Sequence, residues 1–126
     1  TTASPRLAVL IDGENVSARL APLLFQEIAG LGEASVRRIY GDFSGGKMGG
    51  WAAMLGDFGI LPQHFPTVSG KNSSDIAMVI DAMDLLHSGR FDGFCLVTAD
   101  GDFTRLAARI RQLLEDTQHL SGRRIF

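Results

Sequence analysis

Two short apolar runs that each stop at acidic residues in a turn constrain this chain more than any other feature of its sequence. Residues 7–11 (Leu-Ala-Val-Leu-Ile) precede residues 12–15 (Asp-Gly-Glu-Asn), and residues 94–97 (Phe-Cys-Leu-Val) precede residues 98–102 (Thr-Ala-Asp-Gly-Asp). Such runs predict strands that are buried on both faces, as in a parallel sheet covered by helices. Because ligands bind at the carboxyl ends of these strands, we expect both groups of carboxylates to lie at one edge of the sheet.

The rest of the chain alternates strand and helix patterns. Further strands are expected at residues 36–40 and 60–65, and Pro62 favours an edge position because proline cannot donate to a central ladder. Pro22 fits either the first turn of a helix that starts near Ala21 or a kink in a longer one. Three more helices are expected, at residues 51–58, 73–87 and 103–114. This order predicts an α/β fold, a three-layer α/β/α arrangement around a central parallel sheet.

The glycine-rich segment at residues 41–50 is expected to form a mobile loop. Residues 41–47 have the spacing of a Walker loop, but Met48 follows and cannot supply the hydroxyl that binds Mg²⁺ in such loops. A flexible flap, in which Lys47 acts with Lys71 on a polyphosphate backbone, is the better interpretation. Three aromatic side chains could stack on bases if exposed, although core positions are the safer prediction: Phe43, Trp51 and Phe65.

Composition limits the alternatives. The 126 residues (13.6 kDa) predict one domain at residues 7–126, preceded by a disordered lead-in at residues 1–6. No apolar stretch reaches the roughly eighteen residues of a membrane span, and no export signal is visible. Cys95 lies within an apolar run and is expected to be a small buried hydrophobe, which favours a reducing, cytoplasmic setting. The net charge of −2 provides no global attraction to nucleic acid, so phosphate binding must be local.

Each acidic residue has both a functional and a structural interpretation. Asp12 could bind a metal or form an Asx-turn or helix cap, while Asn15 could cap the next helix or hold Asp12. Glu14 could be a ligand or face solvent. One of Asp100 and Asp102 is expected to cap the following helix, and the second carboxylate then favours metal binding.

Asp75 is expected at the start of the helix over residues 73–87, at the edge of the sheet. The helical period predicts an apolar stripe beside it, made of Ile76, Val79, Ile80, Met83 and Leu86. It places Asp81 and Asp84 on the opposite, solvated face. Together, four aspartates from three strand ends supply oxygen-only ligands, which select Mg²⁺ or Mn²⁺ over zinc. Such an ion supports phosphoryl transfer by activating water and stabilising the leaving oxygen.

These motifs, at residues 11–15, 70–75 and 98–103, resemble the NYN domain of the PIN-like nuclease superfamily, and the bacterial LabA-like (DUF88) branch in particular. The resemblance covers residues 7 to about 111. It implies a central parallel sheet in the strand order 3-2-1-4-5 and a Mg²⁺- or Mn²⁺-dependent ribonuclease site. Carried over by position, the metal-site carboxylates are Asp12, Asp75, Asp100 and Asp102, with Asn15 and Thr98 in support.

The sequence departs from this pattern at its end, where residues 112–126 form a charged, poorly patterned tail. Either the domain is truncated, residues are missing from the sequence, or residues 124–126 are a remnant of the fifth strand. The fifth strand and the oligomeric state, including a homodimer, are therefore left open.

The preferred function is a metal-dependent endoribonuclease that acts on RNA, with single-stranded RNA as the expected substrate. Lys71, Lys47 and Arg105 are the expected RNA-binding residues, and they would contact the backbone with little sequence choice. The alternative is a non-catalytic RNA-binding or regulatory module that keeps the pocket. A small-molecule phosphohydrolase is a third possibility, against which the open, glycine-rich flap argues weakly.

Overall fold

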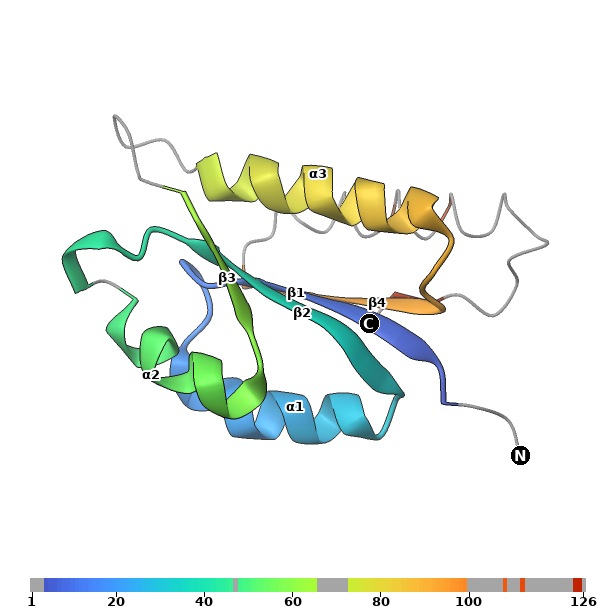
Figure 1. The fold of residues 1–126 in the computed structure, drawn as a ribbon, viewed down its shortest axis with the longest axis horizontal. Helices are drawn as coiled ribbons and strands as arrows, with labels where there is room; N and C mark the ends of the chain where they lie inside the picture. Colours follow the sequence, from blue (N-terminus) through green and yellow to red (C-terminus); the bar gives the residue numbers. More distant parts are fainter. Residues whose placement is uncertain are drawn as a thin grey trace.

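The computed structural model describes residues 4–46, 48–65, 73–99, 108, 112 and 124–125, and of residues 73–75 and 124–125 it describes the backbone alone. Its five parallel strands have the order β3-β2-β1-β4-β5. The strands are β1 (Arg6–Asp12), β2 (Glu33–Gly41), β3 (Leu61–His64), β4 (Gly93–Val97) and β5 (Arg124–Ile125). Helix α3 (Ser73–Ser88) covers one face, and α1 (Ala21–Ala29) and α2 (Gly49–Phe58) cover the other (Figure 1). The expected α/β fold and strand order are confirmed.

The central strand β1 is buried on both faces, as its apolar run predicts. Ala8 and Leu10 pack with α3, whereas Leu7, Val9 and Ile11 pack in the cluster formed with α1 and α2. All five side chains are fully buried. Alternate residues of a strand point to opposite faces, so the position of each residue along β1 determines which helical layer it contacts.

Local signals define the first helix. Ser17 accepts a hydrogen bond from the Arg19 amide and caps the short 3₁₀ helix η1 (Ala18–Leu20), which leads directly into α1. Pro22 lies in the first turn of α1, where its missing N–H has no intrahelical partner to lose. The interpretation of Pro22 as a helix start is therefore confirmed, and the kink is not observed.

The expectation of one loop over residues 41–50 is wrong in its extent. Gly41 is the last residue of β2, a 3₁₀ helix, η2 (Ser44–Gly46), follows, and α2 begins at Gly49. The Asp42 carboxylate accepts a hydrogen bond from the Ser44 amide at 2.9 Å and orders this turn. Lys47 lies outside the described residues.

The apolar stripe expected on α3 is correct only in part: Leu86 is buried, and Val79 and Met83 pack partly buried against the same cluster. The side chains that α3 buries against the sheet are Met78, Ala82, Leu85 and Leu86. Ile76 and Ile80, which were expected in the stripe, are 64% and 54% exposed. The helix is apolar around much of its circumference, so periodicity alone does not select the face that meets the sheet.

At the edges of the sheet, β3 takes the outer position that Pro62 predicts. On the other side, Arg124 and Ile125 pair with Gly93 and Phe94 of β4 and form β5. This pairing matches the expectation that residues 124–126 are a remnant of the fifth strand.

The expected helix at residues 103–114 lies outside the described residues, apart from residues 108 and 112. No helix in the described part of the chain has the length and apolar character needed to cross a membrane.

Candidate active site

The carboxylate of Asp12 is the best-defined element of the candidate site. Asp12 ends β1 and is 1% exposed. Its Oδ2 accepts hydrogen bonds from Asn15 Nδ2 at 2.7 Å and from Thr98 Oγ1 at 2.8 Å. Because Thr98 directly follows β4, its hydrogen bond to Asp12 joins the carboxyl ends of the neighbouring strands β1 and β4. Both of these donors reach Oδ2, so they orient the carboxylate through one oxygen.

The face on which Asp12 lies follows from the alternation along β1. Asp12 has the parity of Ala8 and Leu10, which pack with α3, and its register partner on β2 is Tyr40. Asp12 therefore belongs to the same layer as α3, the helix whose first turn contains Asp75. The side chain of Asp75 lies outside the described residues.

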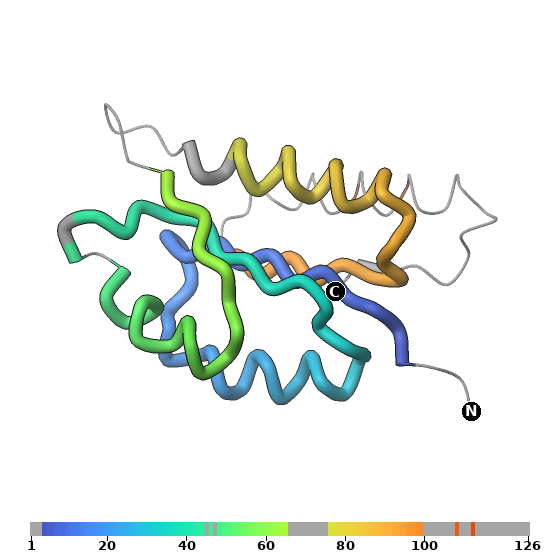
Figure 2. Tube along the Cα trace, viewed as in Figure 1, coloured from blue at the N-terminus to red at the C-terminus, as the bar shows by residue number. Residues whose placement is uncertain are grey.

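Asp12 also lies where the strand order reverses. From β1 the chain passes to β2 and β3 on one side, and it then crosses through α3 to β4 on the other side (Figure 2). At such a switch point the chain leads from β1 to β2 on one side and from β4 to β5 on the other, which opens a crevice at the carboxyl ends of β1 and β4. The Thr98 to Asp12 hydrogen bond crosses this point, so the buried carboxylate lies at the position where α/β sheets bind ligands.

Glu14 makes a contact that the sequence did not predict. It is half-buried, and its Oε1 accepts a hydrogen bond from the backbone N–H of Asp42 at 2.7 Å. The Asp42 carboxylate, itself buried, accepts bonds from the amide and hydroxyl of Ser44. Our sequence analysis missed Asp42, although it too is an acid that follows a strand. In the structure Glu14 and Asp42 join the loops after β1 and β2.

Several expected site residues lie outside the described part of the chain, namely Asp100, Asp102, Lys47, Lys71 and Arg105. Among the described side chains, no group of three or more His, Cys, Asp or Glu residues could hold a metal ion. The structure therefore brings together Asp12, Asn15 and Thr98 and leaves the four-aspartate metal site a prediction.

A groove of about 600 Å³ adjoins this site on the side of α2. It is lined by residues 13–19, Met48, Gly50 and Trp51. Trp51 is 3% exposed and donates from Nε1 to the Val16 carbonyl at 2.8 Å, so it is a core residue and not a base-stacking platform. Phe43 and Phe65 are half-buried against the two core clusters. The core interpretation is confirmed for Trp51, whereas Phe43 and Phe65 lie at the margins of the two clusters.

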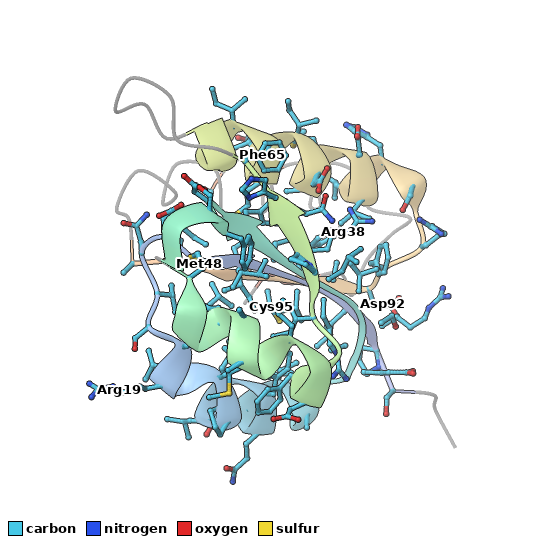
Figure 3. The ribbon with its side chains drawn as sticks, turned by 60° about the vertical axis from the view of Figure 1, so that its left-hand side comes forward. Arg19, Arg38, Met48, Phe65, Asp92 and Cys95 are labelled. Atoms are coloured by element: carbon cyan, nitrogen blue, oxygen red, sulfur yellow. The ribbon has the colours of Figure 1, made fainter. Side chains whose placement is uncertain are left out.

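Cys95 does not take part in the site. It is free, and it lies on β4 in the cluster with α1 and α2, the side on which Figure 3 also shows Met48. Burial raises the pKa of the Cys95 thiol to about 11. The thiol is therefore protonated and poorly nucleophilic near neutral pH, as expected for a small buried hydrophobe.

The comparisons with known proteins agree with this fold. The NYN domain family model matches residues 6–117. The chain belongs to the NYN domain family, and thereby to the PIN-like superfamily. This family is generally nuclease-like, and its nucleases typically use divalent metals and act on RNA.

A solved structure is similar over almost the whole length of the chain. It is a protein of unknown function, VPA0982, from Vibrio parahaemolyticus, with 19% sequence identity and a TM-score of 0.68. The match covers 99% of this chain and 94% of that one. At this identity the likeness supports the fold alone. No curated protein matches the chain.

Proposed function

We propose that this protein is a Mg²⁺- or Mn²⁺-dependent endoribonuclease that cleaves single-stranded RNA. The observation that carries the proposal is the buried Asp12 carboxylate at the switch point, held at Oδ2 by Asn15 and Thr98. A buried carboxylate is costly unless its charge is compensated. Family membership supports the same chemistry.

In this proposal the chain supplies two sets of groups. The carboxylates that bind the ion are Asp12, Asp75, Asp100 and Asp102. Asn15 and Thr98 fix the orientation of Asp12, as partners of metal-ligating carboxylates commonly do. A bound divalent ion supplies an activated water and stabilises the charge that develops on the phosphate. Lys47, Lys71 and Arg105 bind the RNA backbone, and residues 7–126 act as one cytoplasmic domain.

The test is the cleavage of labelled single-stranded RNA by wild type and Asp75→Asn, each with and without Mn²⁺. We expect cleavage by wild type only with the ion, and none by Asp75→Asn. Asp84→Asn is the matched control, because Asp84 is an exposed aspartate on the same helix, and this variant should cleave as wild type does. Equal cleavage by wild type and Asp75→Asn would indicate a contaminating nuclease and remove the enzyme claim.

The second candidate is a non-catalytic RNA-binding or regulatory module; the net charge of −2, which provides no general attraction for RNA, favours its regulatory form. It predicts that Mn²⁺ raises the melting temperature and that Asp100→Asn abolishes the rise, while no RNA is cleaved. Cleavage that depends on both Mn²⁺ and Asp75 would exclude it.

A further inference from the structure

A hydrogen bond from a buried hydroxyl links α3 to the strand beside Asp12. Tyr40, on β2, is 1% exposed, and its hydroxyl donates to Oδ2 of Asp81 on α3 at 2.6 Å. Arg38 lies beneath α3 and approaches the same oxygen at 3.3 Å (Figure 3). The prediction that Asp81 is a solvated charge is thus wrong, whereas Asp84 is exposed as expected.

The protonation state of Tyr40 keeps this link in place. Burial, together with the hydrogen bond and the charge of Asp81, raises the pKa of the Tyr40 phenol far above its ordinary value. The phenol therefore stays a donor throughout the physiological range. A short bond from a buried donor to a carboxylate is among the stronger hydrogen bonds in proteins.

Apolar packing alone leaves the rotation of α3 poorly defined. Met78 and Ala82 are buried, yet Ile76 and Ile80 on another side of the helix are equally apolar and exposed. A helix with apolar residues on several sides can bury comparable area in more than one orientation. The directional bond between Tyr40 and Asp81 distinguishes the observed orientation from the others, because a rotated helix would leave the buried phenol without its acceptor.

This orientation determines where the first turn of α3 lies. Asp75 is six residues before Asp81, about 9 Å along a helix axis at 1.5 Å per residue. At 100° per residue its α-carbon falls within about 40° of the middle of the arc that α3 buries against the sheet. Tyr40 is also the register partner of Asp12. One hydroxyl therefore connects the backbone neighbour of Asp12 with the helix that carries Asp75.

We propose that Tyr40 is a positioning residue for the metal site: through Asp81 it sets the rotation of α3, and thereby where the first turn of α3, which contains Asp75, lies relative to Asp12. This inference rests on the proposed function, because it requires both aspartates to bind one ion.

The experiment measures the Mn²⁺ dissociation constant of the full chain by calorimetry, together with RNA cleavage over a range of Mn²⁺ concentrations. Tyr40→Phe removes only the hydroxyl, and half-exposed Asp81 then keeps Arg38 and water, so the variant should fold. We expect its Mn²⁺ affinity to fall by roughly tenfold, the lower end of the loss seen for outer partners of metal ligands. Saturating Mn²⁺ should restore its cleavage rate, because the effect acts through binding of the ion.

Two further variants separate positioning from general destabilisation. Asp81→Asn keeps an oxygen that can accept from Tyr40, and should retain most of the affinity, whereas Asp81→Ala should match Tyr40→Phe and add nothing when combined with it. Ile28→Val removes a methylene from the cluster on the opposite face of the sheet, and should lower stability without changing Mn²⁺ affinity.

The outcomes distinguish this inference from the proposed function. If wild type binds Mn²⁺ but Tyr40→Phe binds it equally well, or Ile28→Val weakens binding as much, positioning by Tyr40 is overturned and the metal site stands. If wild type does not bind Mn²⁺ at all, the metal site and the inference fall together.

Discussion

The hydrogen bond from Thr98 to Asp12 allows the sharpest test of the site geometry. Thr98→Val replaces the hydroxyl with a methyl group of similar size and removes the 2.8 Å bond to Oδ2, while Asn15 still donates to the same oxygen. Asp12 is 1% exposed, so water can restore little of the lost interaction. Hydrogen bonds to charged groups contribute about 1.5–3 kcal/mol, and we expect Thr98→Val to lower the free energy of unfolding by that amount.

The assay is urea unfolding in chelator-treated buffer, followed by Mn²⁺ titration of the folded protein. Thr98→Ser keeps the hydroxyl and is the matched control, with stability close to wild type apart from the lost methyl group. In an Asp12→Ala background the acceptor is absent, so Thr98→Val should lower the free energy of unfolding by less than it does in the wild-type background. In the wild-type background Mn²⁺ affinity should also fall by about 10-fold or more.

The reasoning would be refuted by either of two results. One is that Thr98→Val lowers the free energy of unfolding by less than about 0.5 kcal/mol in the wild-type background, since solvent or another donor would then replace Thr98 at Oδ2 of Asp12. The other is an equal loss with and without the Asp12 carboxylate, which would assign the effect to other interactions of the Thr98 side chain.

Three further predictions concern the scaffold. Cys95 should resist alkylation in the native protein at about pH 8 and react in urea. Burial raises the pKa of its thiol from 9.0 to about 11, so the unfolded chain loses the proton at lower pH than the folded protein does. The free energy of unfolding should therefore decline more steeply between these two pH values in wild type than in Cys95→Ala. Gly13→Ala should destabilise the protein by about 1–3 kcal/mol, because the new β-carbon would lie 2.9 Å from Ile39 and press on Met48, and an unchanged urea midpoint would contradict this. Gly56→Ala is the opposite case, since nothing lies within 4 Å of that position in α2, and it should stabilise the protein by about 0.5–1 kcal/mol in the same assay.

The parts of the fold that short-range patterns encode could be predicted from the sequence. The apolar runs at residues 7–11 and 94–97 identified the two neighbouring strands β1 and β4, and Pro62 identified the edge strand. The start of α1 followed from Pro22, whose fixed φ suits the first turn of a helix. In each case the residues that determine the structure are adjacent along the chain.

Features that depend on distant partners could not be predicted in this way. Asp81 was assigned to solvent because helical periodicity contains no information about Tyr40, which lies 41 residues away. Glu14 likewise bonds to the Asp42 amide 28 residues away. At the candidate site, the proximity of Asn15 to Asp12 followed from their spacing of three, whereas the bond from Thr98 required the pairing of β1 with β4.

The outer strand β3 has a consequence for how copies of this protein meet. The Phe65 amide donates to Gly41, so by alternation the amide positions of Pro62 and His64 turn away from the sheet. Proline has no N–H, which leaves His64 as the outward donor within β3. A strand from another molecule needs a regular row of donors to extend the sheet, and Pro62 interrupts that row on the outer edge of β3. Pro62 thereby disfavours edge-to-edge growth of the sheet along β3.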